Sequence, residues 1–444
     1  MKSKRGLLQR QGLKIFKAGI RAVDPEKLVK KCFRKEINKL HVGEKVYPLD
    51  KIRRIIVVGA GKASARMARA VEDILKGEIH SGVVITKHGY LAKLRRIKLI
   101  QAGHPVPDKN GLRGTEKIIR LLKTAGKKDL VICLISGGGS SLLVSPVKQV
   151  SLEDKRKTTD LLLRCGAEIR EINAIRKHLS GVKGGNLAKI VYPAKVCSLI
   201  LSDVAGDRLD VIASGPTSAD RSNFYQCLKI IRKYELSRKI PYSVIHYLKT
   251  SLGKGKGETP KPRSRFFRKV QNLIIGSNIE ALRGCEKKAK RLGFKTFLLS
   301  KPMIGDNHQA ARKLINLVKK IRKQGRKSGL PVCVICGGET TVKVTGKGLG
   351  GRNQELALLC AIGISKIKKV FVLSGSTDGT DGSTDAAGAF CDGNTVSRAE
   401  HKGLGAEEFL KNNDSYHFFK KVKGLVKTKP TGTNVMDIHL VLVG

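Results

Sequence analysis

The sequence predicts an α/β protein that consists of two different domains with mostly parallel sheets. Short aliphatic and β-branched runs alternate with helical patterns along the chain, and several of these runs lead directly into glycine-rich turns. A strand, a glycine turn and a helix, repeated at short intervals, are typical of parallel βαβ units. The chain has 444 residues, more than one hydrophobic core usually organises, so we expect two domains.

The N-terminal part of the chain contains the clearest alternation, and we assign residues 1–250 to a first, Rossmann-like domain. An amphipathic stretch that begins at Leu7 predicts an opening helix, and Asp24 with Pro25 is typical of the start of the next helix. Segments rich in Val, Ile and Leu predict four strands, at residues 55–58, 83–85, 130–135 and 196–201.

A linker and a second α/β domain are expected in the C-terminal part. Residues 251–265, SLGKGKGETPKPRSR, are rich in Gly, Pro and charge and offer little to bury, as is typical of a linker. The second domain then comprises residues 266–444. Its strands are expected at residues 272–276, 294–299, 332–335, 370–373 and 438–443.

The net charge is unusual. The chain carries 88 Lys and Arg against 36 Asp and Glu, a formal charge of +52, and such an excess raises the hypothesis of nucleic-acid binding. The cations are spread through nearly every predicted helix and turn, however, and we find neither zinc-finger spacing nor an aromatic RNA-binding motif. We therefore expect no specific nucleic-acid partner, only non-specific polyanion binding, and keep a basic nucleic-acid-binding protein as an alternative.

Cysteine usage and hydropathy place the protein in the cytoplasm. The ten cysteines lack the spacing of a disulfide framework, which predicts reduced thiols. Cys333 and Cys336 form a CxxC within an apolar strand pattern that puts them on opposite faces. No apolar run approaches the roughly 20 residues of a spanning helix, and no signal peptide is recognised. We expect a monomer or a homodimer.

The first glycine turn, VVGAGKAS, follows the strand at residues 55–58. Gly59 and Gly61 would let backbone N–H groups approach an anion, and Lys62 adds a positive charge. The turn is not a P-loop, because Ile56 stands where that motif has Gly, and it lacks the third Gly of a dinucleotide fingerprint, where Ser64 stands. A phosphate site and a purely structural turn both fit this pattern.

Two further turns in the first domain are rich in polar residues. SGGGSS places Gly137, Gly138, Gly139, Ser140 and Ser141 directly after a strand, which favours a concave row of donors for phosphate. SDVAGD follows another strand, and its two carboxylates, Asp203 and Asp207, are candidate Mg²⁺ ligands; an Asp-stabilised turn is the alternative.

The second domain contains a matching group of turns, GGETT, GKGLGGRNQE and STDGTDGSTDAAG. Arg352 and Asn353 would stand at a helix start, where a guanidinium and free N–H groups can bind a carboxylate or phosphate. We expect Glu339 and Asp378 to contact the same substrate. Cationic and acidic turns from both domains would meet in an interdomain cleft, the arrangement that phosphoryl transfer requires.

Several of these strings together resemble the class II glycerate kinases, in which a MOFRL domain follows an N-terminal domain. The resemblance extends from about Leu7 to Leu442 and includes the strings VVGAGKAS, HPVPDKNG, SGGGSSLL, INAIRKHLSGVKGGNLA, LILSDVAGDRLDVIASGPT, GGETTVKVTGKGLGGRNQELAL, STDGTDGSTDAAGA and PTGTNVMD. It implies two α/β domains with the active site between them. The implied reaction is ATP-dependent phosphorylation of D-glycerate with Mg²⁺, usually to 2-phosphoglycerate, with 3-phosphoglycerate as the other possible product.

The resemblance also implies roles for individual residues. Lys62 and Arg352 would be the principal catalytic cations, and nucleotide phosphates would lie near the 137–140 loop with Lys183 and Asp203 close by. Three positions depart from the family pattern, at Lys429, Met436 and the pair Asp306-Asn307. These departures bear on the geometry of the C-terminal loops more than on the chemistry.

The main enzymatic alternative is an NAD(P)-dependent hydroxypyruvate reductase. Ser64 counts against it, and so does Thr86-Lys87 after the strand at residues 83–85, where a dinucleotide fold would place an acidic residue. His104 and His178 could act in acid–base chemistry, but no sequence pattern singles them out, and His104 in GHPVPD is more typical of loop packing.

Overall fold

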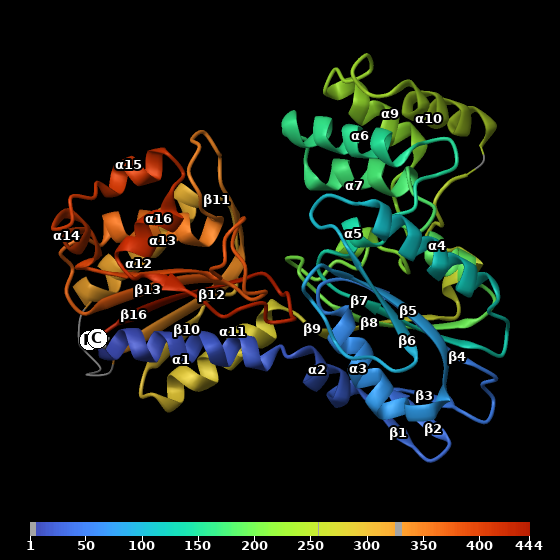
Figure 1. The fold of residues 1–444 in the computed structure, drawn as a ribbon, viewed down its shortest axis with the longest axis horizontal. Coiled ribbons are helices and arrows are strands. Elements are labelled where there is room, and N and C mark those ends of the chain that lie inside the picture. Colours follow the sequence, from blue (N-terminus) through green and yellow to red (C-terminus); the bar gives the residue numbers. More distant parts are fainter. Residues whose placement is uncertain (1–5, 256, 325–330) are drawn as a thin grey trace. The chain divides into compact units, whose positions relative to one another are not determined.

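The computed structural model describes residues 6–255, 257–324 and 331–444. The chain forms two compact units (Figure 1). The N-terminal unit is Pro25–Ile275, and the C-terminal unit joins Met1–Asp24 to Gly276–Gly444. The expectation of two α/β domains is confirmed.

The N-terminal unit is built around a six-stranded sheet with the order β6-β5-β4-β7-β8-β9. All four strand pairs with a defined register, from β6 to β8, are parallel. Two central strands are buried along their whole length because helices cover both faces. The strands are β4 (Ile55–Ala60), β5 (Ile79–Lys87), β6 (Ile97–Ala102), β7 (Leu130–Ile135), β8 (Lys195–Leu201) and β9 (Val270–Gly276).

Helices surround this sheet and also form a separate group. α6, α7, α9 and α10 share their own apolar core and lie together beyond one end of the sheet (Figure 1). A small antiparallel sheet, β1 (Phe33–Glu36), β2 (Lys39–Val42) and β3 (Lys45–Pro48), completes the unit. Its helices are α2 (Pro25–Cys32), α3 (Ser64–Leu75), α4 (Lys109–Lys123), α5 (Gly139–Leu142), α6 (Leu152–Arg164), α7 (Ile169–His178), α8 (Asn186–Val191), α9 (Phe224–Lys233) and α10 (Tyr242–Lys254), with 3₁₀ turns at Lys76–Glu78, Ile212–Ser214 and Arg265–Phe267.

The C-terminal unit has a seven-stranded mixed sheet. Its order is β10-β12-β16-β13-β14-β15, with β11 also paired to β12. The last strand of the chain, β16, lies antiparallel between β12 and β13, so this sheet is less parallel than the sequence suggested. The strands are β10 (Lys295–Leu298), β11 (Met303–Asp306), β12 (Val332–Thr341), β13 (Val370–Ser376), β14 (Gly388–Asp392), β15 (Leu425–Val426) and β16 (Asp437–Val443).

Helices cover both faces of the C-terminal sheet. Figure 1 shows α1 and α11 on one face and the other helices of the unit on the opposite face, where they enclose a large apolar core. The helices are α1 (Leu7–Ala22), α11 (Asn278–Arg291), α12 (Asn307–Gln324), α13 (Arg352–Gly363), α14 (Thr395–Glu400), α15 (Ala406–Lys411) and α16 (Ser415–Lys421).

The opening helix α1 belongs to the C-terminal unit, which differs from the expected first domain of residues 1–250. Small residues explain the packing. A Cβ on Gly19 would lie 2.4 Å from the Sγ of Cys285, and one on Gly12 would lie 2.1 Å from the Cε1 of Phe371. Glycine at these positions therefore lets α1 pack closely against α11 and β13.

The boundary between the units also differs from the expected linker at residues 251–265. Helix α10 continues to Lys254, and the strand expected to open the second domain is β9, which joins the N-terminal sheet. Val270 and Ile274 explain this placement, because both pack against the apolar core of that sheet. The unit therefore ends at Ile275.

Two further expectations concern cysteines and membranes. All ten cysteines are free thiols, as expected, and Cys333 and Cys336 are buried in β12. Within residues 6–255, 257–324 and 331–444, no helix has both the length and the apolar character to cross a bilayer.

Candidate active site

The first glycine turn is held against the second by direct contacts in the N-terminal unit. Gly61 has φ 143°, and a Cβ at this position would lie 2.1 Å from the Oγ of Ser136. The N–H of Lys62 donates to the carbonyl oxygen of Gly137 at 2.9 Å. The parallel register of β4 and β7 pairs Ala60 with Ile135, so both strands end at the same edge of the sheet. The two expected phosphate turns therefore form one structure.

Lys62 and His104 lie beside the second glycine turn. Gly138 has φ 82°, a left-handed conformation that favours glycine. A Cβ on Gly138 would lie 2.9 Å from the Cδ2 of His104 and 3.4 Å from the Cγ of Lys62. Lys62 is 9% exposed. The structure thus brings one predicted cation and one histidine to the glycine loop.

Hydroxyl groups connect this loop to a strained segment. The Oγ atoms of Ser140 and Ser214 lie 2.7 Å apart, and Ser214 also donates to the Oδ1 of Asn173 on α7 at 3.5 Å. Ala213 and Ser214 have φ values of 50° and 59°. Non-glycine residues in this conformation are strained, and such strain is often found where a side chain must be positioned. Ser141 turns inward, donating to the carbonyl oxygen of Gly138 at 3.1 Å.

Lys183 supports the glycine loop from inside the protein. It is 1% exposed, and its Nζ donates to the carbonyl oxygens of Ser140 at 2.6 Å and Leu143 at 3.1 Å. Burial lowers the pKa of Lys183 well below its ordinary value, and the nearby charges of Lys155 and Arg176 add to this effect. Lys183 is predicted to lie near nucleotide phosphates, and its Nζ contacts the backbone of the loop that is expected to bind them.

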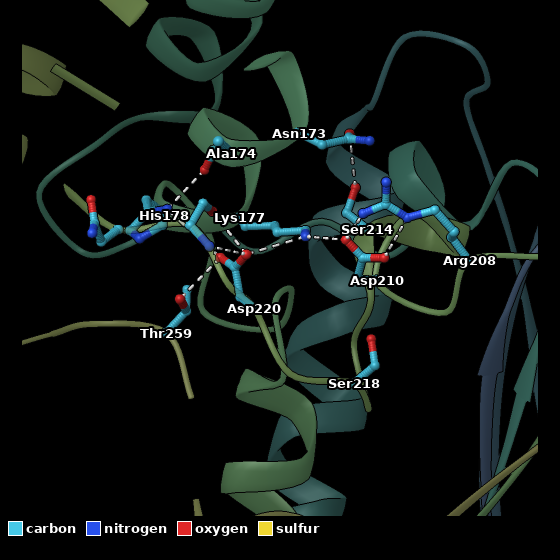
Figure 2. A network of polar contacts seen from close by, with 12 residues as sticks. Asn173, Ala174, Lys177, His178, Arg208, Asp210, Ser214, Ser218, Asp220 and Thr259 are labelled. Atoms are coloured by element: carbon cyan, nitrogen blue, oxygen red, sulfur yellow. Dashed lines mark hydrogen bonds and ion pairs between the residues drawn. The ribbon is translucent and has the colours of Figure 1, made fainter. Parts of the chain in front are cut away.

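A polar network anchors α7 to the segment after β8 (Figure 2). The Nζ of Lys177 lies 3.3 Å from the Oδ1 of Asp220 and 3.5 Å from the Oδ2 of Asp210. Arg208 donates to both carboxylate oxygens of Asp210, at 3.1 and 2.9 Å. A buried cation between two carboxylates fixes the segment that carries Ser214. Sequence reasoning did not identify these residues.

The expected metal ligands lie on a turn after β8. Asp203 and Asp207 are both partly buried, and Asp207 has φ 52° with its N–H donating to Val204 at 3.0 Å. Among the described residues, no group of three or more His, Cys, Asp or Glu side chains is arranged around a common metal position. Two carboxylates still fit Mg²⁺, which commonly completes its coordination with substrate phosphates and water.

Arg352 in the C-terminal unit is held by two carboxylates. Its Nε and Nη2 donate to the two oxygens of the fully buried Asp437 at 2.6 and 2.9 Å, and its Nη1 lies 2.9 Å from the Oε1 of Glu339. Burial would lower the pKa of Arg352, but the charge and hydrogen bonds of Asp437 outweigh it and raise that pKa. The structure thus joins two predicted residues, Arg352 and Glu339, in one ion pair.

The start of α13 does not offer the free N–H groups that the sequence suggested. Asp381 accepts hydrogen bonds from the backbone N–H of Asn353 at 3.1 Å and of Gln354 at 2.9 Å. The side chain of Asn353 is fully buried, donating to Asp381 and accepting from Ser374. Burial and the charge of Asp437 raise the pKa of Asp381 to about 6. An internal carboxylate therefore occupies the position expected for a ligand.

Asp378 is likewise an internal residue. It is 4% exposed, and its Oδ1 accepts from Ser376 and from the N–H of Thr380, each at 2.9 Å. These bonds are typical of an Asp that stabilises its own turn. The C-terminal turns are thus built largely from carboxylates that already have partners.

The structure also gives physical reasons why the first turn departs from a dinucleotide fold. Ser64 is buried, and its Oγ donates to Gly61 at 2.6 Å and Ile85 at 3.1 Å. Thr86 at the end of β5 is buried and donates to the same Gly61 oxygen at 3.2 Å. Thr86 thus stands where a dinucleotide fold would place its ribose-binding carboxylate, and its hydroxyl stabilises the glycine turn.

The comparisons with known proteins agree with this geometry. Residues 11–249 match the family model described as "Domain of unknown function (DUF4147)", and residues 332–437 match the MOFRL family. The chain is 41% identical to a glycerate 2-kinase from Pyrococcus horikoshii, covering 97% of this chain and 96% of that protein. It is 40% identical to a D-glycerate 2-kinase from Thermotoga maritima, covering 98% of each.

Solved structures give the same result. A crystal structure of glycerate kinase from Thermotoga maritima has a TM-score of 0.84 at 40% identity and covers 98% of this chain and 99% of that chain. Fold and site define a two-unit α/β protein with two joined glycine turns at one edge of its parallel sheet. The chain belongs to the glycerate kinase family that combines the DUF4147 and MOFRL domains.

Proposed function

We propose that this protein transfers the terminal phosphoryl group of ATP to D-glycerate and forms 2-phosphoglycerate. The observation that carries the proposal is the joined pair of glycine turns, in which Lys62 donates through its backbone to Gly137 and its side chain lies beside Gly138. An ammonium beside such a glycine loop suits a polyphosphate. The relatives named as glycerate 2-kinases supply the acceptor and the position of the new phosphate.

The proposed chemistry consists mainly of positioning and charge stabilisation. Nucleotide phosphates bind along Gly137–Ser141, and Lys62 neutralises charge on the phosphoryl group as it moves. Gly59 lies within β4 and the N–H of Gly61 donates to Ile85 at 3.1 Å, so these two glycines shape the turn. Asp203 and Asp207 would hold Mg²⁺, which neutralises the phosphate oxygens when bound. Lys183 keeps the loop in shape by holding the carbonyl oxygen of Ser140.

Arg352 binds the carboxylate of glycerate in this proposal. The Oε1 of Glu339 lies 2.9 Å from the Nη1 of Arg352, and the Glu339 side chain is 48% exposed. A glycerate carboxylate can replace Glu339 in that pair, whereas the buried Asp437 keeps the guanidinium oriented. Asn353 and Asp378 do not contact glycerate in this proposal; they shape the start of α13 and the neighbouring turn.

The test is ADP formation from ATP and Mg²⁺ with D-glycerate, L-glycerate and hydroxypyruvate in parallel. We expect ADP with D-glycerate, and phosphorus NMR should place the new phosphate on the 2-hydroxyl. A 3-phosphoglycerate signal would change the assigned hydroxyl but leave the kinase activity as proposed. Steady NADH oxidation by hydroxypyruvate that survives Lys62→Ala, without ADP formation from glycerate, would contradict the kinase and favour the reductase.

A further inference from the structure

Three cationic side chains lie together within the N-terminal unit, near the glycine loop. Lys155 is 6% exposed, and its Nζ donates to the carbonyl oxygens of Leu179 at 2.7 Å and of Arg176 at 3.3 Å. Lys183 is 1% exposed and also donates only to carbonyl oxygens. The third, Arg176, is partly buried on α7. We call these residues the cation cluster.

No carboxylate neutralises the cation cluster. Among the described residues, the side chain of Arg176 forms neither a hydrogen bond nor an ion pair, and both lysines contact carbonyl oxygens alone. The nearby acids Asp210 and Asp220 are already paired with Lys177. Buried charges without counter-ions are costly for a fold, so their retention calls for an explanation.

Burial disfavours the charged form of all three side chains, and repulsion from their neighbours adds to this for the two lysines. Burial lowers the pKa of Lys155 to about 7, with a further contribution from the charge of Arg176. The charges of Lys155 and Arg176 also lower the pKa of Lys183. Burial lowers the pKa of Arg176 itself. An anion bound near the cluster would relieve this repulsion.

Helix geometry places Arg176 on the side of α7 that faces the glycine loop. Asn173 precedes Arg176 by three residues, a spacing that puts both on one helix face. Asn173 accepts a hydrogen bond from Ser214, whose Oγ lies 2.7 Å from the Oγ of Ser140 in the loop (Figure 2 shows Asn173 and Ser214). The same loop residue binds Lys183 through its carbonyl oxygen at 2.6 Å. Lys183 of the cation cluster thus contacts Ser140 directly, and Asn173, one helical turn before Arg176, is linked to Ser140 through Ser214.

We propose that Arg176 is a further phosphate-binding residue, whose guanidinium contacts phosphate oxygens of a ligand bound at the 137–141 loop. A guanidinium can donate two parallel hydrogen bonds to such a group, and an anion bound there would favour the charged forms of Lys155 and Lys183. That the ligand is a nucleotide rests on the proposed function. The chemistry requires only phosphate oxygens, which MgADP, pyrophosphate and a phosphorylated product all supply.

A structural role and a ligand-binding role for Arg176 predict opposite effects of its removal on stability. If Arg176 held the fold together, its removal would lower the melting temperature. If it is retained for a ligand, removal relieves repulsion within the cation cluster, and the melting temperature without ligand should stay the same or rise. Stability and affinity measured on the same variant therefore distinguish the two roles.

The experiment compares Arg176→Gln with Arg170→Gln, a matched control on the same helix whose arginine is 71% exposed. Isothermal titration of the full chain with MgADP, pyrophosphate and 2-phosphoglycerate gives the Kd values, and the three arms identify the source of the phosphate. We expect Arg176→Gln to weaken MgADP at least tenfold without lowering Tm, and the control to match wild type.

A Kd for MgADP within threefold of wild type, or a Tm below that of wild type, would overturn this proposal. Its failure is separable from failure of the proposed function. If glycerate is not phosphorylated but Arg176→Gln still weakens MgADP or pyrophosphate as expected, the phosphate site stands and only the assigned acceptor is wrong.

Discussion

The cation cluster of the N-terminal unit and Arg352 of the C-terminal unit differ in whether acidic side chains neutralise them. In the N-terminal unit, Lys155, Arg176 and Lys183 are buried or partly buried, and the two lysines contact only carbonyl oxygens. In the C-terminal unit, Arg352 is bound through three of its nitrogens by Asp437 and Glu339. The first region holds buried basic groups without acidic partners, and the second holds a guanidinium whose charge is already balanced.

This difference indicates which of the two units is better suited to bind a polyanion. A site with unneutralised cations attracts phosphate and becomes more stable when phosphate binds. A site in which Arg352 is already paired can accept a ligand carboxylate only by exchanging one partner, and Glu339 is the exposed one. We therefore assign the polyphosphate to the N-terminal unit and the single carboxylate of glycerate to Arg352.

The largest expected effect is on the stability of the C-terminal unit. Arg352→Ala leaves Asp437, which is fully buried, without its partner, and breaking a buried pair in this way costs about 3–5 kcal/mol. Urea denaturation should show a much lower midpoint. Replacing both residues by leucine should recover part of the loss; a single variant as stable as wild type would contradict the balanced pair.

The next effect is on turnover. Lys62→Ala should lower kcat by about 10² or more, because Lys62 is assigned to charge that develops in the transition state. ADP release with D-glycerate measures it, and Lys229→Ala, an exposed lysine on α9, serves as the control. A variant with raised KM and unchanged kcat would limit Lys62 to ground-state binding.

Stability should also depend on pH through His178. Burial lowers its pKa, but contacts with Cys227, Glu258 and Ala174 prevail and raise it to about 10 from an ordinary 6.5. The stabilisation is therefore complete below pH 6.5 and is lost as pH rises towards 10, on the order of 2 kcal/mol or more.

Glu258→Gln removes one partner of His178 and should flatten this dependence. The free energy of unfolding is measured from pH 6 to 10 for wild type and for Glu258→Gln. Subtracting one curve from the other cancels the titrations that the two proteins share. Parallel curves would exclude His178 as the source.

The smallest effect is expected at Ser214. Ser214→Ala removes the hydroxyl that joins Ser140 to Asn173, and a lost hydrogen bond of this kind is worth about 1 kcal/mol. KM for ATP should rise several-fold with kcat little changed. An equal rise in KM for glycerate would mean that the segment does not act on the nucleotide loop alone.

The strands of the N-terminal sheet were predictable because buried parallel strands are continuous apolar runs. The strand expected at 130–135 matches β7, and the glycine turns after β4 and β7 lie where the pattern put them. Which sheet a strand joins was not predictable: β9 and β16 look alike as apolar runs, yet one extends the N-terminal sheet and the other lies antiparallel at the centre of its own. Tertiary packing decides that.

The site was only partly readable from the sequence. Glycine turns after strands predicted Lys62 and the 137–141 loop as one site, and the structure brings them together. Arg176 and Lys177, in contrast, stand in a charged run of the kind that usually faces solvent. The burial of Lys177 follows from its ion pairs with Asp210 and Asp220, which lie far from it in sequence. Asp381 was similarly hidden, because its role as a partner of the α13 N–H groups depends on residues far away in sequence.

Hydrogen exchange with and without MgADP, in the absence of glycerate, tests the central claim that the unneutralised N-terminal region binds the nucleotide. We predict slowed amide exchange in residues 59–62, 137–143 and 173–184, with little change in residues 352–356. Protection confined to residues 352–356, with none at the glycine loop, would contradict the account.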